Sequence, residues 1–88
     1  MIRKPLGYQQ ITVLTSAVGF TSPPKGANRA MLICTGQDVR WRDDGTNPTA
    51  TVGFLLTTGI NYIYEGDLEA IKFIQSAATA VLNISYYD

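Results

Sequence analysis

The chain has 88 residues, one cysteine and no histidine, so it cannot form an internal disulfide and lacks the ligands of ordinary zinc sites. Seven basic and seven acidic residues give a formal charge of zero, whereas a nucleic-acid-binding protein normally shows a basic excess. A chain of this size hides only about 60–65% of its unfolded surface, and we expect oligomerisation or docking onto a larger body to add the missing stability.

The first seven residues predict an extended N-terminal arm. Residues 1–7 combine two adjacent charges with a proline and a glycine and show no hydrophobic period. Residues 8–88 contain no linker or repeat, which predicts a single domain. No apolar run reaches the length of a signal peptide or a membrane span, so we expect synthesis in the cytoplasm and no membrane partner.

Short segments rich in β-branched and aromatic residues alternate with turn residues along the domain. The expected strands or extended pieces are Gln9–Leu14, Ala17–Thr21, Arg29–Thr35, Asp38–Arg42, Thr51–Thr57, Asn61–Tyr64 and Val81–Tyr87. Turn signals roughly every 8–12 residues favour an all-β protein, either a small barrel or a small antiparallel β-sandwich of jelly-roll type. We predict the sandwich.

The segment Asp67–Ala80 fits two structures. Leu68, Ile71 and Ile74 recur at helical spacing, and Asp67 would be a suitable N-cap. The same segment also alternates as a strand would, with Ile71 and Phe73 on one face. The pattern alone leaves helix and strand equally open.

Period-two alternation places Trp41 in the core. Val39 and Trp41 alternate with Arg40 and Arg42, so both arginines should lie on the outer face. There they would either pair with nearby carboxylates or contact another protein.

Three further residues are assigned from their neighbours in the sequence. Tyr86 and its neighbour Tyr87 point in opposite directions in a strand, so one would be buried and the other available to a partner. Cys34 lies in an apolar run and is predicted to be a buried small hydrophobe without reactivity.

No arrangement of titratable residues predicts an enzyme. The densest carboxylate pair, Asp43-Asp44, precedes Gly45, and the three residues are typical of a turn in which the glycine takes a positive φ. A two-carboxylate hydrolase or a calcium site that includes Asn47 is less consistent with the spacing. Serines and threonines are present, but no histidine could activate them. We therefore predict no catalytic residue, metal or cofactor.

The arrangement of turns and strands carries a family resemblance. Its residues are Val39-Arg40-Trp41-Arg42-Asp43-Asp44-Gly45, then Pro48-Thr49-Ala50, Gly53, Leu56 and Gly59, then Tyr64-Glu65-Gly66-Asp67-Leu68, Ile71 and Phe73-Ile74, and finally Leu82-Asn83-Ile84-Ser85-Tyr86-Tyr87. From about Gln9 to Tyr87 the chain resembles small proteins that tailed bacteriophages encode among their virion structure genes. The resemblance implies a compact β-sandwich without catalytic residues, and for Asp67–Ala80 it favours a short turn followed by a strand.

The expected function is therefore structural. The resemblance implies a capsid decoration (cement) protein or a head–tail accessory, made in the host cytoplasm and residing in the virion. Its expected partners are the major capsid protein or other virion proteins, together with further copies of itself. The alternative is a tail or fibre module that binds the host surface or a glycan through Trp41 and the tyrosines. The residues expected at the protein interface are Ile2, Arg3, Lys4, Leu6, Arg40, Arg42 and Tyr87.

Overall fold

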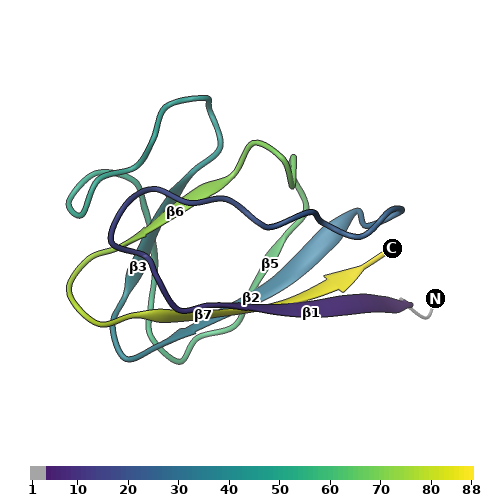
Figure 1. Ribbon diagram of the computed structural model, residues 1–88, viewed down its shortest axis with the longest axis horizontal. Coiled ribbons are helices and arrows are strands. Elements are labelled where there is room, and N and C mark those ends of the chain that lie inside the picture. Colours follow the sequence, from purple (N-terminus) through teal and green to yellow (C-terminus); the bar gives the residue numbers. More distant parts are fainter. Residues whose placement is uncertain (1–3) are drawn as a thin grey trace.

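The computed structural model describes residues 4–88, which form two antiparallel sheets and no helix (Figure 1). The strands are β1 (Pro5–Ile11), β2 (Arg29–Thr35), β3 (Val39–Arg42), β4 (Phe54–Leu56), β5 (Tyr62–Tyr64), β6 (Lys72–Gln75) and β7 (Val81–Tyr87). One sheet has the order β1-β7-β2-β5 and the other the order β4-β3-β6. The predicted all-β antiparallel sandwich is confirmed, with seven strands in the described residues where a jelly roll has eight.

The longest pairing joins β2 to β7 and supplies half of the core. Strand β7 alternates between buried and partly exposed residues, as its sequence predicts. The nearly continuous apolar run of β2, which could have been covered on both faces, also alternates, because Met31 and Ile33 stay partly exposed. The buried residues stand opposite one another as Ala30–Tyr86, Leu32–Ile84 and Cys34–Leu82. The three-stranded sheet contributes Val39, Trp41, Leu56 and Phe73 from the facing layer.

The segment between β1 and β2 closes one side of the sandwich. Val18 exchanges two backbone hydrogen bonds with Phe73, of 2.9 and 2.8 Å, and the Leu14 carbonyl accepts one from Gln75 at 3.0 Å. These bonds cover the outer edge of β6. Phe20 then packs on Phe73 and Tyr86 with ring centroids 5.1 and 5.5 Å apart. In Figure 1 this dark-blue segment crosses from the end of β1 towards β6.

The segment Asp67–Ala80 is a turn followed by a strand. The Asp67 carboxylate accepts a hydrogen bond from the Glu69 amide at 2.9 Å, and its carbonyl accepts one from the Ala70 amide at 3.1 Å. Strand β6 follows and pairs with β3 over Val39–Arg42. The helical interpretation is wrong because this pairing buries Phe73 and leaves Lys72 on the outer face.

Two strands differ from their predicted bounds. Strand β1 begins at Pro5, so it contains the last three residues of the predicted arm, and it ends at Ile11 before Leu14 joins the three-stranded sheet. Strand β4 covers only three residues of the predicted Thr51–Thr57. The residues Met1–Arg3 lie outside the described part of the chain.

Candidate protein-binding surface

Four aromatic side chains meet at one side of the core. The inward-facing ring of Trp41 contacts Phe54, Tyr62 and Tyr64, with ring centroids 4.9, 5.8 and 5.5 Å apart. We call these four residues the aromatic cluster. Trp41 comes from β3, Phe54 from the edge strand β4, and the two tyrosines from β5, which is the edge strand of the other sheet. The cluster therefore lies where the two sheets meet along β4 and β5.

The outer members of the cluster face the core by register but are open to solvent. Phe54 stands opposite Trp41, and Tyr62 stands opposite the buried Leu32. Nevertheless, Phe54 is 65% exposed and Tyr62 is 39% exposed. No segment within residues 4–88 covers them in the way that Phe20 covers Phe73 on the other side. The core of the sandwich thus reaches the surface between β4 and β5.

Six of the eight large exposed hydrophobic residues in the described chain lie within residues 52–63: Val52, Phe54, Leu55, Ile60, Tyr62 and Ile63. Leu55 stands opposite Arg40 and Ile63 opposite Met31, so these two point to the outer faces of their sheets. Val52 lines a hollow together with Phe54, and we call Val52 and the aromatic cluster the open side. Single exposed apolar residues are ordinary, but a concentration of them typically marks a binding surface.

Charged side chains border the open side but do not come from its edge strands: Arg42, Asp43 and Asp44 line the hollow beside Val52 and Phe54. Residues 45–64, which include both edge strands, contain no Asp, Glu, Lys or Arg. Natural proteins usually protect exposed sheet edges with charged side chains, above all lysine, because an unprotected edge pairs readily with other proteins. Strands β4 and β5 lack that protection.

The base of the open side is held by hydrogen bonds from β3 and its flanking turns. Arg40 donates through Nη1 to the Gly53 carbonyl at 3.1 Å, which ties its guanidinium to the start of β4. Gly53 has φ 141°, and a Cβ there would lie 3.0 Å from the Trp41 carbonyl oxygen. A glycine is therefore needed for β4 to approach β3 this closely.

The carboxylates of Asp38 and Asp43 accept hydrogen bonds from residues that follow β4 or belong to β5. Asp38 Oδ1 accepts hydrogen bonds from the Thr58 hydroxyl and amide, at 2.6 and 2.7 Å, and these bonds lower the pKa of Asp38. The Tyr64 hydroxyl donates to Asp43 Oδ2 at 2.7 Å. Burial and the nearby carboxylate raise the pKa of Tyr64 well above its ordinary value. The edge strands are thus anchored although their side chains are exposed.

The Arg-Trp-Arg and Asp-Asp-Gly predictions hold. Trp41 is buried, and Arg42 on the outer face pairs with the Asp44 carboxylate. Asp44 Oδ1 also accepts a hydrogen bond from the Thr46 amide at 3.3 Å, and Gly45 has φ 89°. Asp44 therefore shapes the turn, whereas Asp43 binds the Tyr64 hydroxyl.

The structure does not gather the predicted interface residues on one surface. Arg40 and Arg42 lie on the outer face of the three-stranded sheet, whereas Tyr87 alternates with the buried Tyr86 and lies on the outer face of the other sheet. Leu6 is partly buried against the core.

Of the remaining predicted residues, Lys4 is exposed, and its amide donates to the Asp88 side chain at 3.0 Å. Ile2 and Arg3 lie outside the described residues. The predicted set omitted the open side, which the charge-free run 45–64 could have indicated.

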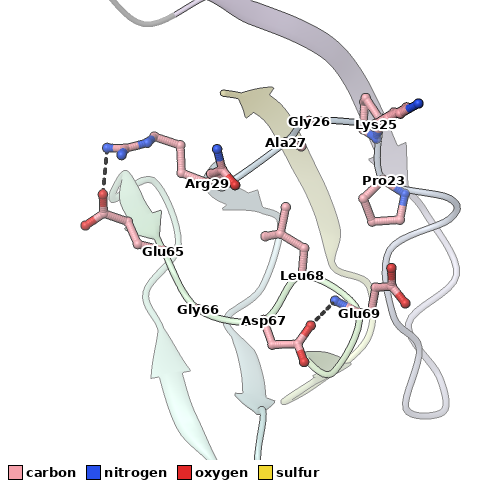
Figure 2. Close-up of a pocket in the computed structure, with 12 residues that line it drawn as sticks. Pro23, Lys25, Gly26, Ala27, Arg29, Glu65, Gly66, Asp67, Leu68 and Glu69 are labelled. Atoms are coloured by element: carbon pink, nitrogen blue, oxygen red, sulfur yellow. Dashed lines mark hydrogen bonds and ion pairs between the residues drawn. The ribbon is translucent and has the colours of Figure 1, made fainter. Parts of the chain in front are cut away.

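A second hollow, of about 760 Å³, lies between the loops 23–29 and 65–69 (Figure 2). Three of its charged groups have partners in the chain: Glu65 pairs with Arg29 at 2.6 Å, and the Asp67 carboxylate accepts the hydrogen bond from the Glu69 amide. Figure 2 shows these contacts along the two walls. The hollow has no nucleophile paired with a base, so we assign it no chemistry.

Reactive groups are sparse elsewhere in residues 4–88. Cys34 is fully buried, its thiol donates to the Leu56 carbonyl at 3.2 Å, and burial raises its pKa. No three His, Cys, Asp or Glu side chains of the described chain are placed to hold a metal ion. The same residues include no helix that could cross a bilayer. No family model, curated protein or solved structure matches the chain.

Proposed function

We propose that this protein is a non-enzymatic structural module that binds other protein through its open side. The observation that carries the proposal is the exposure of Phe54 and Tyr62, which face the core by register yet remain uncovered. A partner that covers these rings would bury apolar surface at about 25 cal/mol per Å². Strands β4 and β5 themselves contribute no charged side chain to such a contact.

The resemblance to small virion proteins supports a more specific role. We propose that the protein decorates the capsid of a tailed bacteriophage, after synthesis in the host cytoplasm, and binds the assembled shell rather than loose subunits. Binding only the assembled form would stabilise the shell by mass action. The partners in this proposal are the major capsid protein and further copies of the chain, and neither nucleic acid nor a membrane is involved.

The experiment mixes purified protein with tailless heads, isolated tails and unassembled capsid protein, and follows its sedimentation with each. We expect many copies to sediment with heads and none to bind unassembled subunits. Phe54→Lys should weaken head binding at least about tenfold, which corresponds to about 1.4 kcal/mol. The matched control is Val13→Lys, because Val13 is 69% exposed but lies in the segment that closes the opposite side.

Other outcomes would change the assignment. Binding to tails alone would replace the decoration proposal with the tail or fibre module. A sugar platform on Trp41 has little support, because that ring is only 9% exposed beside Phe54 and Tyr62. Equal binding of both lysine variants would show that the open side is not the docking surface.

A further inference from the structure

We infer that β1 pairs edge to edge with β1 of a second copy, so that the four-stranded sheets of the two copies join into one continuous sheet across a two-fold axis. The contact lies at the opposite edge of this sheet from β5 and the open side. The inference goes beyond the proposed function and stands independently of it.

Strand β1 is the longest free sheet edge in residues 4–88, and Figure 1 shows it at the rim of the molecule. It covers seven residues, whereas the edge strands β4 and β5 cover three each, and Val18 bonds to the outer edge of β6. The Thr21 amide donates to the inward-facing Gln9 at 3.2 Å, so this loop lies on the inner side of β1. Residues 5–11 carry no charge. Natural proteins usually shorten, cover or charge an edge strand, because its free backbone groups pair with other chains.

The backbone of β7 alternates between facing β2 and facing β1, as in any antiparallel sheet. The Tyr87 carbonyl accepts a hydrogen bond from the Asn28 amide, which precedes β2, at 2.9 Å. The Cys34 carbonyl of β2 accepts one from the Gly59 amide at 2.9 Å and so points away from β7, at the residue that stands opposite Leu82. Tyr87 therefore faces β2, and Leu82 faces β1.

The register then shows which residues of β1 face the free edge. Residues 82, 84 and 86 of β7 face β1, where they stand opposite Ile11, Gln9 and Gly7. These three residues bond to β7. Tyr8 and Gln10, which lie between them, direct their backbone groups away from β7. Each supplies one N–H donor and one C=O acceptor at the free edge.

The spacing of Tyr8 and Gln10 makes β1 complementary to itself. A two-fold axis at Gln9 sets two copies of β1 antiparallel and places Tyr8 of each copy opposite Gln10 of the other. Each pair exchanges two hydrogen bonds, so every outward group of these residues gains a partner. An axis at Tyr8 would instead set Gln10 opposite Leu6, where the register of β1 is irregular. No other strand of the described residues offers a free, uncharged edge of this length, which identifies a second β1 as the matching strand.

A second copy also fits this edge in charge. Residues 5–24 contain no charged side chain, so no charge follows β1 into the contact. Lys4 immediately precedes β1, and the two-fold axis would place the two Lys4 residues at opposite ends of the paired strands. At about 3.4 Å per residue they would lie roughly 30 Å apart, where their repulsion is screened. Tyr8, which is 67% exposed, would gain a cross-strand neighbour for its ring.

The first test is sedimentation velocity of the free protein over a dilution series. The wild type should form a dimer that dissociates on dilution. Tyr8→Pro removes an N–H at the free edge, where a strand tolerates proline, and should raise the dimer dissociation constant at least about tenfold. Gln10→Lys places a charge on the edge and should have the same effect. The matched control Ala77→Lys changes an exposed turn after β6 and should dimerise like the wild type.

Amide hydrogen exchange of the wild type tests the register without any substitution. The amides of Gly7, Gln9 and Ile11 bond to β7 and should be protected at every protein concentration. The amides of Tyr8 and Gln10 should exchange rapidly in dilute protein and become protected as the dimer forms. If they stay unprotected in the dimer, the inference is overturned.

A wild-type protein that stays monomeric up to about 100 μM, where even a weak micromolar dimer would be occupied, overturns the inference. A dimer that Gln10→Lys leaves as stable as Ala77→Lys does also overturns it, because the contact then lies elsewhere. If circular dichroism shows that Tyr8→Pro is unfolded, Gln10→Lys and hydrogen exchange decide by the same criteria.

Phe54→Lys separates this inference from the proposed function. It alters the open side and should leave the dimer intact while weakening head binding. A dimer that Phe54→Lys dissociates and Gln10→Lys does not would overturn the inference and place the second copy on the open side. A monomer that still binds heads through Phe54 would refute the dimer and preserve the proposed function, and a dimer that ignores heads would do the reverse.

Discussion

Trp41 and Phe54 pack ring against ring with centroids 4.9 Å apart, yet Trp41 is nearly buried and Phe54 is mostly exposed. This contact therefore joins a side chain of the core to a side chain of the surface. The opposite side is different, because Phe20 lies over Phe73 and the backbone around Val18 covers the edge of β6. The two sides of the sandwich therefore differ, and the open side is the one that we propose another protein covers.

Phe73, on the closed side, and Phe54, on the open side, should contribute very differently to the free energy of unfolding. Phe73→Ala empties a fully buried site and should lower the free energy of unfolding by ~3–5 kcal/mol. Phe54→Ala loses mainly one aromatic contact and should cost about 0.5–1.5 kcal/mol. Urea denaturation of dilute protein measures both. If Phe54→Ala lowers the free energy of unfolding as much as Phe73→Ala does, Phe54 contributes to folding and not to binding.

Gly36 and Gly45 have similar φ values, but substitution by alanine should destabilise the protein to different extents at the two positions. Gly36 has φ 84°, and a Cβ there would meet the Thr79 carbonyl oxygen at 2.4 Å, whereas Gly45 has φ 89° with nothing within 4 Å. Gly45→Ala should cost only the backbone strain of about 1–2 kcal/mol. Gly36→Ala adds a clash with backbone and should cost clearly more. Thermal unfolding compares them, and equal costs would contradict the close approach of Gly36 to Thr79.

Alkaline pH should destabilise the fold through its buried tyrosines. Burial raises the pKa of Tyr86 from its ordinary 10 to about 12, and the pKa of Tyr64 is also raised. The unfolded chain loses these protons first, so the tyrosines' contribution to stability is constant below pH 10 and falls as the pH rises towards 12, by up to about 1.4 kcal/mol per unit of pKa difference. Unfolding curves at several pH values measure this slope.

Tyr86→Phe provides the control for the alkaline loss. It keeps the ring in the core but removes the hydroxyl that donates to Gln9 Oε1 at 2.7 Å. The variant should therefore show a shallower loss of stability between pH 10 and 12, with the remaining slope due to Tyr64. An unchanged slope would show that Tyr86 is already ionised or exposed in the folded protein.

The thiol of Cys34 should be unreactive in the native protein. It is fully buried, hydrogen-bonded to the Leu56 carbonyl, and has a raised pKa because of burial and the Asp38 carboxylate. Since the thiolate is the reactive form, alkylation should require unfolding and should accelerate with denaturant. Mass spectrometry after iodoacetamide treatment tests this. Fast modification without denaturant would mean that β2 and β4 separate readily.

The sequence predicted the fold where its pattern was strongly periodic. Val81–Tyr87 has the expected bounds because it alternates over seven residues with one face in the core, and Arg29–Thr35 has them because its apolar run has the length of a strand. Asp67–Ala80 was ambiguous because Leu68 and Ile71 are buried by a turn, so their spacing imitates a helix. Pairing with β3, a contact distant in sequence, decides the structure there.

The binding surface was harder to predict. Phe54 and Tyr62 belong to segments that alternate or cluster like core strands, and hydrophobicity alone placed no such residue at the surface. Their exposure results from the order of strands, which makes β4 and β5 the uncovered edges of the two sheets. The predicted arginines are instead used within the chain, since Arg40 binds the Gly53 carbonyl and Arg42 binds Asp44.

Hydroxyl-radical footprinting tests the central claim most directly, because it reports which side chains solvent reaches in both the free and the assembled protein. Dilute free protein should be modified at Phe54, Tyr62 and Val13, which are all exposed. In head-bound protein, we predict that Phe54 and Tyr62 become protected while Val13 remains as reactive as before. Modification of Phe54 that stays equal to that of Val13 in every assembled state would contradict the claim that protein covers the open side.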